Sequence, residues 1–140
     1  MRRVLGIDLG TVRTGVAIAS TAVAQPLVVI EESDDDRIVE RVAEITHDES
    51  VTEIVFGIPI ALDGTEGPAA TRAREIARRL QEKVGLRVHL WDERLTTAQA
   101  ERTMVGGGVR RKKRRAVVDK IAATLLLQSY LDAQTAKGRS

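Results

Sequence analysis

The first thirty residues contain three short apolar runs separated by turn residues. The runs are rich in β-branched side chains or follow a glycine or a proline, as strands commonly do. The three predicted strands are Val4–Ile7, Thr14–Ala19 and Leu27–Ile30. A glycine-containing turn joins the first two, so they should pair as a hairpin. The third should extend the hairpin into an antiparallel meander.

From residue 33 onward the spacing of apolar side chains predicts helices that alternate with strands. Ser33-Asp34-Asp35 is a helix-start signal, and the apolar positions from Ile38 to Ile45 have helical spacing. Three glycines and two prolines predict a loop over residues 57–68, and Gly106-Gly107-Gly108 should begin a second, basic loop. The later predicted elements are a strand at Ile54–Phe56, a helix from Pro68 to Gly85, a strand at Val88–Trp91, a helix from Thr96 or Thr97 to about Val105, and a last helix from about Ala116 to Gln134.

This order, β-β-β-α-β-α-β-α-α, predicts an α/β fold with a mixed five-stranded sheet covered by helices. Three strands form the antiparallel meander and the later strands add in parallel, an order that matches a ribonuclease H-like fold. A chain of 140 residues has the size of one domain, so residues 1–140 are expected to form a single unit. Hydrophobic residues at 43% and charged residues at 30% are typical of a folded, soluble domain.

Composition excludes several classes of function. The chain has no cysteine, and hence no disulfide framework and no thiolate metal site. It has no apolar run of the roughly 18 residues that a membrane span needs, and no apolar N-terminal stretch typical of a signal peptide, so a cytoplasmic location is expected. Only Phe56, Trp91 and Tyr130 are aromatic, which argues against base stacking as a main means of binding nucleic acid.

Charge is distributed unevenly, although the net charge is only +2. Residues 31–53 contain ten acidic residues and two arginines, a net charge of −8, whereas residues 101–140 contain ten basic and three acidic residues, a net charge of +7. Such a basic segment is typical of phosphate contacts, although a solvated loop is an equally simple interpretation. Six of its basic residues are consecutive: Arg110, Arg111, Lys112, Lys113, Arg114 and Arg115.

Three acidic residues stand where a carboxylate would be costly without a partner. Asp8 ends the first strand, Glu93 follows Asp92 at the end of the last strand, and Asp119 lies among apolar positions of the last helix. The carboxyl ends of parallel strands meet at one edge of a sheet, and a helix across that edge would add the third carboxylate. Oxygen ligands of this kind suit Mg²⁺ or Mn²⁺, and a pair of such ions can promote phosphoryl transfer. Taken singly, each acid also fits a structural role in a turn, an ion pair or a helix-dipole contact.

Two arginines and two histidines complete the set of candidates. Arg13 and Arg94 each lie close in sequence to a candidate acid, so each is either the ion-pair partner of that acid or a clamp for a substrate phosphate. His47 falls in the acidic helix, where we expect it to be exposed, and His89 falls inside a strand, where we expect it to be packed. Neither histidine is placed to activate a serine or cysteine nucleophile.

Four short motifs follow one another along the chain. They are Asp8-Leu-Gly10-Thr-Val-Arg13-Thr-Gly15, then Val55-Phe-Gly57-Ile-Pro59 with Asp63-Gly64-Thr-Glu66-Gly67-Pro68, then Asp92-Glu93-Arg94-Leu95-Thr96-Thr97, and finally Val118-Asp119-Lys120-Ile-Ala122-Ala123 with Tyr130-Leu131. Together, over nearly the whole chain, they resemble the YqgF/RuvX family of Holliday junction resolvases, related to RuvC and the ribonuclease H superfamily. The resemblance implies a metal-dependent nuclease with Asp8, Glu93 and Asp119 as metal ligands. It implies two compatible roles, maturation of the 5′ end of precursor 16S rRNA and resolution of four-way DNA junctions.

Two departures limit what the resemblance implies. Ala61 stands where family members often have asparagine, so the resemblance does not imply a substrate contact at this position. The last helix carries Asp119 where RuvC has two acids, because Asp132 lies more than three turns away. A similar metal site is therefore implied, not an identical activity.

Two other functions compete with a nuclease. The segment Gly6-Ile-Asp8-Leu-Gly10-Thr resembles the first phosphate loop of actin-, sugar-kinase- and heat-shock-type ATP-binding proteins, but those need two lobes and more than twice this length. A non-catalytic nucleic-acid or ribosome-assembly module would bind without cleaving, yet clustered carboxylates repel phosphate and so favour the nuclease. The sequence thus predicts a Mg²⁺- or Mn²⁺-dependent endonuclease, monomer or homodimer, whose partner is precursor rRNA or branched DNA.

Overall fold

The computed structural model describes the backbone of residues 1–96 and 111–138, and the side chains of residues 1–96 and 121–137. The helix expected from Thr96 or Thr97 to Val105, the glycines at 106–108 and Arg110 lie outside the described residues. No helix within the described ranges is long and apolar enough to cross a membrane.

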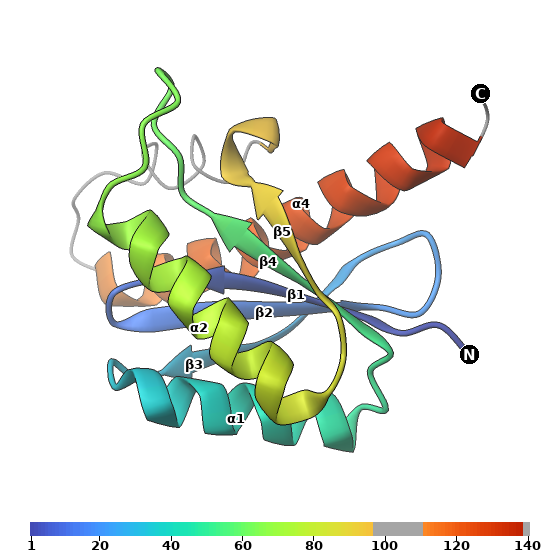
Figure 1. The fold of residues 1–140 in the computed structure, drawn as a ribbon, viewed down its shortest axis with the longest axis horizontal. Coiled ribbons are helices and arrows are strands. Elements are labelled where there is room, and N and C mark those ends of the chain that lie inside the picture. The colour runs from blue at the N-terminus through green and yellow to red at the C-terminus, as the bar shows by residue number, and fades with distance from the viewer. Residues whose placement is uncertain (97–110, 139–140) are drawn as a thin grey trace.

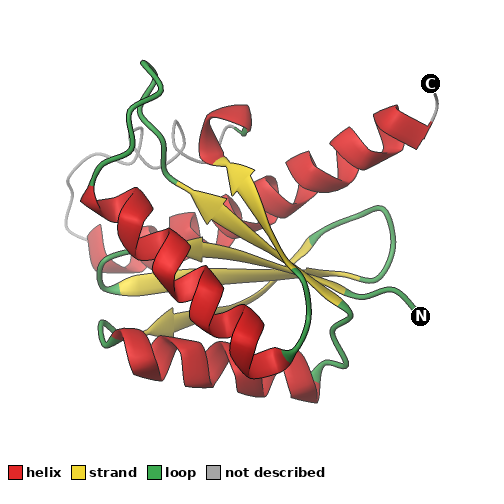
Figure 2. Cartoon of the chain, in the orientation of Figure 1, coloured by secondary structure: helices red, strands yellow, loops and turns green. Residues whose placement is uncertain are grey.

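Five strands form one mixed sheet with the order β3-β2-β1-β4-β5 (Figures 1 and 2). The first three strands pair antiparallel, and β4 and β5 add to β1 in parallel. The predicted mixed sheet, with its meander followed by parallel strands, is confirmed. The strand bounds are β1 Val4–Leu9, β2 Arg13–Ala19, β3 Gln25–Glu31, β4 Glu53–Ile58 and β5 Val88–Asp92.

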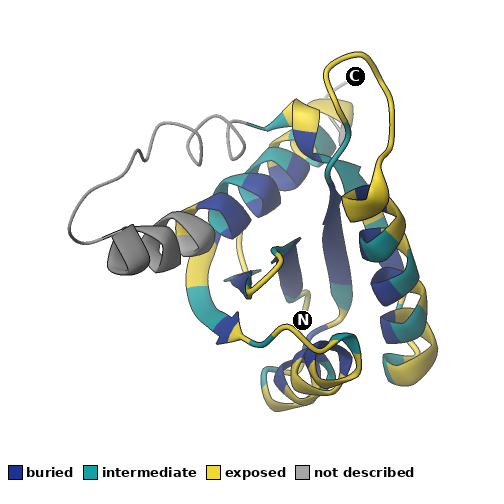
Figure 3. Cartoon of the chain, turned by 90° about the vertical axis from the view of Figure 1, so that its left-hand side faces the viewer, coloured by how far each residue is buried: buried dark blue, intermediate teal, exposed yellow. Residues whose placement is uncertain are grey.

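Helices cover both faces of this sheet. Helices α1 (Asp35–Asp48) and α2 (Pro68–Val84) lie on one face, and α4 (Arg111–Gly138) crosses the other (Figures 1 and 3). A short 3-10 turn, Glu93–Leu95, follows β5. The structure corrects one prediction, because α4 begins at Arg111 and not near Ala116, so the run 111–115 is helical and not a loop. Lysine and arginine are good helix formers, which is why a run of them continues the helix backward.

Local chemistry sets the helix ends. The Asp34 side chain accepts a hydrogen bond from the backbone N–H of Arg37 at 3.2 Å and caps the start of α1. Pro68 opens α2, where a missing N–H costs nothing. Gly85 ends α2 with φ of 71°, a left-handed conformation that glycine adopts without strain. The three signals predicted from the sequence therefore act where they were expected.

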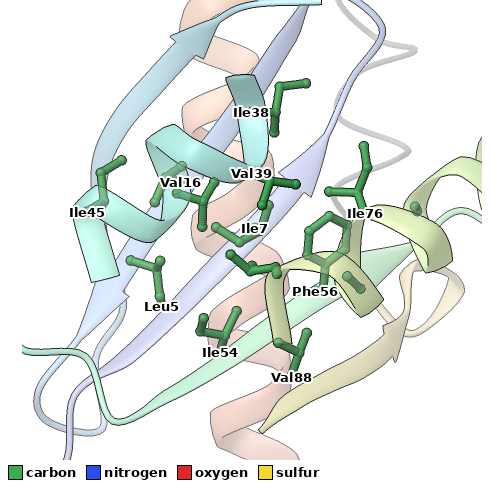
Figure 4. Packing of buried hydrophobic residues seen from close by; sticks show 14 of the residues in the cluster. Leu5, Ile7, Val16, Ile38, Val39, Ile45, Ile54, Phe56, Ile76 and Val88 are labelled. Carbon is green, nitrogen blue, oxygen red and sulfur yellow. The ribbon is translucent and has the colours of Figure 1, made fainter. Parts of the chain in front are cut away.

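The alternation of side chains along the strands creates two apolar clusters. Leu5 and Ile7 of β1 point into the larger cluster under α1 and α2, together with Phe56 of β4 (Figure 4). Val4 points the other way, into the cluster that packs against α4. Gly6 shares that second face, and a Cβ built there would stand 2.8 Å from the Cβ of Leu127. Because α4 approaches β1 this closely, the helix is held at a fixed depth over the sheet.

Candidate active site

Asp8 is a buried carboxylate near the carboxyl end of β1. Only 3% of the surface of Asp8 is exposed to solvent. Strand alternation places it on the same face as Val4 and Gly6, which is the face that α4 covers. Across the hairpin, Asp8 pairs with Gly15 of β2, so no bulky side chain stands beside it on that strand. The sequence therefore places this acid beneath the α4 layer and not in the apolar core on the opposite face.

Glu93 is the second buried carboxylate, and it comes from a different element. It opens the 3-10 turn after β5 and is also only 3% exposed. Its side chain lies over Gly57 of β4, because a Cβ built on Gly57 would stand 3.1 Å from Glu93 Oε1 and 3.2 Å from Glu93 Cγ. The same Cβ would clash with Leu126 of α4. Glu93 therefore folds back under α4, onto the face that also carries Asp8.

The strand register brings these two acids together. Ile7 pairs with Phe56, so Asp8 and Gly57 are the next residues along two neighbouring parallel strands, about 4.8 Å apart. Glu93 occupies the space above Gly57, and Asp8 projects from the adjacent strand on the same face. Two buried carboxylates thus share one location at the carboxyl end of the sheet.

Helix α4 runs over this location in a defined direction. Tyr130 contacts Glu53 at the start of β4, whereas Leu126 lies over Gly57 near its end, so α4 runs opposite to the strand. Leu127 and Ala123 both lie against Gly6. Asp119 is four residues before Ala123, one helical turn nearer to Asp8, although its side chain is outside the described residues. The role of Asp119 as a third acid of the site therefore stays a prediction.

Within the described residues, no group of three or more histidine, cysteine, aspartate or glutamate side chains is placed to hold a metal ion. Asp8 and Glu93 supply two oxygen donors of the type that hard divalent cations prefer. Water molecules, backbone carbonyl groups and further carboxylates are the other oxygen donors that such cations accept. The donor chemistry therefore fits Mg²⁺ or Mn²⁺, and it offers no nitrogen or sulfur ligand for a softer metal.

Arg94 lies beside the site and is held by Asp92. Its Nε lies 3.0 Å and its NH2 2.7 Å from Asp92 Oδ2, and the hydrogen bond from Arg94 holds the pKa of Asp92 below its usual range. The NH1 group donates to the carbonyl of Ala61 at 3.5 Å. Arg94 therefore connects the turn that carries Glu93 with the loop after β4. An ion pair with the candidate acid Glu93 was one of the two roles predicted for Arg94, whereas the acid that holds it in the structure is Asp92.

Arg13 lies on the same face as Asp8, two residues from its cross-strand partner Gly15. Its Nε is 3.4 Å from Glu31 Oε1 on β3, and only 12% of its side chain is exposed. The ion-pair partner is thus an acid far away in sequence, which the sequence did not predict. Of the basic run, Arg111–Arg115 are placed as helical backbone only.

Both histidines lie where they were predicted. His47 is exposed on α1. His89 is half-buried in β5, with its ring 5.6 Å from the ring of Tyr130 and its Nε2 3.4 Å from Glu53 Oε2. This contact lies toward the amino ends of the strands, away from Asp8 and Glu93.

The sequence missed the part played by Gly57. The sequence predicts that a loop begins at Gly57, but Gly57 lies within β4 and provides the space that Glu93 occupies. A glycine inside an apolar strand is itself a signal of close approach by another group. The identity of that group depends on a residue 36 positions away, which no local pattern reveals.

Residues 2–133 match the RuvX family, which is described as Holliday junction resolvase. The chain belongs to the RuvX family. Among the proteins it is similar to, those of Shouchella clausii (strain KSM-K16) and Geobacillus sp. (strain WCH70) are 42% and 43% identical to it over 137 and 136 residues. The two alignments cover 95% and 94% of this chain, and 96% and 99% of those proteins. Both relatives carry the name "Putative pre-16S rRNA nuclease".

Solved structures of resolvases share the fold of this RuvX chain. Thermus thermophilus RuvC in complex with a Holliday junction substrate matches with a TM-score of 0.63 and 19% identity, over 96% of this chain and 98% of RuvC. The fowlpox virus resolvase in complex with Holliday junction DNA matches with a TM-score of 0.55 and 8% identity, over 94% of this chain and 98% of the resolvase. At these identities the likeness concerns the fold, and it confirms the predicted ribonuclease H-like architecture.

Proposed function

We propose that this RuvX chain is a divalent-metal-dependent endonuclease that hydrolyses a phosphodiester bond in structured nucleic acid. The observation that carries the proposal is the pair of buried carboxylates, Asp8 and Glu93, on one face of the sheet beneath α4. Burying one carboxylate is expensive, and burying two beside each other is more so, because their like charges add to the cost of desolvation. The arrangement is therefore one that a bound cation would stabilise.

Asp8, Glu93 and Asp119 are the residues that would hold Mg²⁺ or Mn²⁺. When bound, such ions would stabilise the negative charge that develops on the attacking water oxygen and on the leaving ester oxygen of the phosphodiester. The chain itself fixes the donors. Gly57 leaves room for the Glu93 side chain, and Leu126 covers it from the α4 side. Ligands from β1, from the turn after β5 and from α4 would then act as one site, although they are far apart in sequence.

Basic side chains around the carboxylates would bind the nucleic-acid backbone. Arg13 and Arg94 lie beside the site, and the run from Arg110 to Arg115 precedes or begins the helix that carries Asp119. Contacts of this kind recognise phosphates more than bases. We therefore expect binding that weakens strongly with salt and shows little dependence on base sequence.

The first candidate substrate is precursor 16S rRNA, because relatives at 42–43% identity are named "Putative pre-16S rRNA nuclease". The resemblance of the sequence motifs to the RuvX family points to its 5′ end. The second is a four-way DNA junction, supported by the description of the RuvX family. A role on precursor rRNA would be carried out in the cytoplasm. Either substrate can be handled by one active site, and a symmetric cut of a junction would need a homodimer.

Cleavage of both substrates by one preparation tests the proposal. Labelled precursor RNA and a labelled four-way junction are incubated with the wild-type protein, Glu93→Gln and Asp119→Asn, each with Mg²⁺ or Mn²⁺. We expect wild-type cleavage of at least one substrate and loss of cleavage in both variants. Asp132→Asn, an exposed acid of α4, is the control and should cleave normally. Binding without cleavage by the wild-type protein under every condition would favour a non-catalytic module instead.

A further inference from the structure

Arg72 of α2 reaches the turn that follows Asp8. Its NH1 donates to the carbonyl oxygen of Gly10 at 2.8 Å, and its Nε donates to Asp35 Oδ1 at 2.9 Å. Asp35 is the first residue of α1. One half-buried guanidinium therefore joins α2, the start of α1 and the β1–β2 turn.

The turn needs such an external contact. Residues 10–12 lie between the two paired strands, so the strand ladder does not hold them. The turn is tight, because a Cβ built on Gly10 would clash with the carbonyl oxygen of Arg13. A hydrogen bond from a charged guanidinium is stronger than one from a neutral donor. Arg72 is thus the described side chain that anchors the Gly10 carbonyl to the rest of the fold.

We propose that Arg72 is a positioning residue for the candidate metal ligand Asp8. The proposal rests on the proposed function, because it assigns Arg72 to that site. Gly10 is two residues beyond Asp8, and Leu9 lies between them at the end of β1. Anchoring Gly10 fixes the direction in which the end of β1 points. It therefore fixes Asp8 relative to Glu93, which is held separately over Gly57.

The chain offers a matched comparison in Arg79. It lies seven residues further along α2 and pairs through NH1 with Asp36 Oδ1 of α1 at 3.0 Å. Arg79 makes the same kind of bridge between the two helices, but no contact with the β1–β2 turn is among its described interactions. Loss of Arg79 therefore reports the effect of removing its ion pairs with Asp36 of α1 and Glu75 of α2, with no described contact to the β1–β2 turn removed. Asp35→Asn does the same at Arg72, because it weakens the ion pair and leaves the donor to Gly10 in place.

The experiment measures Mn²⁺ binding to the full chain by calorimetry, the Mn²⁺-induced rise in Tm, and the Mn²⁺ concentration that half-activates cleavage. The variants are Arg72→Met, Arg72→Lys, Arg79→Met and Asp35→Asn. Residues that orient metal ligands typically change metal affinity about 10–100-fold. We expect Arg72→Met to weaken Mn²⁺ binding about 10-fold or more and to raise the half-activating concentration in parallel. Arg72→Lys should recover part of the loss, because an ammonium group can still donate to the carbonyl.

Arg79→Met and Asp35→Asn should stay within about 2-fold of wild-type Mn²⁺ affinity, even where they lower Tm. If the wild-type protein binds Mn²⁺ but Arg72→Met and Arg79→Met bind it with equal affinity, the positioning role of Arg72 is overturned. The proposed function would not be affected by that result. If Arg72→Met does not fold, the comparison passes to Arg72→Lys against Asp35→Asn, and equal affinities there would overturn the positioning role too. Absence of Mn²⁺ binding by the wild-type protein would contradict the proposed function and the role of Arg72 with it.

Discussion

The side chain of Glu93 occupies the place that a side chain at Gly57 would need. A Cβ on Gly57 would stand 3.1 Å from Glu93 Oε1, and it would also clash with Leu126. Gly57 lies on β4, Glu93 follows β5 and Leu126 belongs to α4, so three elements meet at this point. The glycine is therefore what lets a carboxylate and a helix share the space beside Asp8.

Gly57→Ala should damage both the fold and the site. The added methyl group must push Leu126 or Glu93 aside, and overpacking of this kind costs about 1–3 kcal/mol. We expect a lower free energy of unfolding in urea. If Glu93 holds a metal ion as proposed, disturbing its position should also reduce Mn²⁺-dependent cleavage about 10-fold or more, the loss typical when groups that orient metal ligands are changed. Gly67→Ala is the matched control, because nothing lies within 4 Å of a Cβ there. A Gly57→Ala protein as stable and active as the Gly67→Ala protein would refute the close packing.

Glu53→Gln should change stability in a pH-dependent way. Burial opposes ionisation of Glu53, but hydrogen bonds from Arg2 and from the Tyr130 hydroxyl outweigh it and lower its pKa. The pKa of Tyr130 is raised to about 12, first by burial and then by the charge of Glu53, so its hydroxyl stays protonated and donates. A carboxylate with a lowered pKa stabilises the fold above its unfolded pKa of about 4.5. That stabilisation is lost as pH falls through the lower folded value.

We therefore expect Glu53→Gln to reduce the free energy of unfolding by about 1–3 kcal/mol at pH 7, from the loss of hydrogen bonds to a charged group. The difference from wild type should shrink below pH 4.5. Urea unfolding at pH 7 and at pH 3.5 measures both values. An equal difference at the two pH values would show that the charge of Glu53 contributes nothing.

Arg94→Met and Asp92→Asn should act in opposite directions on substrate binding. Arg94 is held by Asp92, so Asp92→Asn leaves the guanidinium in place with less competing negative charge. If Arg94 binds a phosphate, Arg94→Met weakens nucleic-acid binding about 3–10-fold in KM or Kd, whereas Asp92→Asn leaves it unchanged or tighter. Fluorescence anisotropy with labelled RNA measures the affinities. If both variants bind RNA equally weakly, Arg94 acts as a structural partner of Asp92 and does not bind a phosphate.

The basic run should determine the salt dependence of binding. Each phosphate contact that is lost lowers the slope of log K against log salt by about 0.7–0.9. We expect the pair Arg111→Gln and Lys112→Gln, introduced together, to lower the slope by about 1–2 if both residues contact phosphate. Arg78→Gln, which removes an exposed arginine of α2 that pairs with Glu75 and Glu82, is the control and should keep the wild-type slope. If the double variant and the Arg78→Gln control have identical slopes, Arg111 and Lys112 do not contact the phosphates of the substrate.

Much of the fold was predictable because its signals are local. The apolar runs of the first strands, the Asp34 cap, Pro68 and Gly85 each act within a few residues, and each is found where the sequence placed it. The start of α4 was not predicted, because a run of like charges that follows three glycines favours a loop. Lysine and arginine are also good helix formers, and here the run continues the helix that follows it.

The two buried acids of the candidate site were also identifiable, because charged residues at strand ends interrupt an apolar pattern. Their contacts were not. Glu93 over Gly57 and Arg72 against Gly10 join residues 36 and 62 positions apart, and Arg13 meets Glu31 through strand register. Contacts of this kind depend on the depth and direction of packed elements, which follow from the whole fold.

The most direct test of the account is Mn²⁺-dependent cleavage by Asp8→Asn. The substitution keeps the size of the side chain and removes its charge, so circular dichroism should show the wild-type fold. If Asp8 holds the metal ion as proposed, its loss should remove several kcal/mol of transition-state stabilisation and lower the cleavage rate by about 100-fold or more. Asp48→Asn, at an exposed acid of α1, should cleave at the wild-type rate. A folded Asp8→Asn protein that cleaves as fast as wild type would contradict the account.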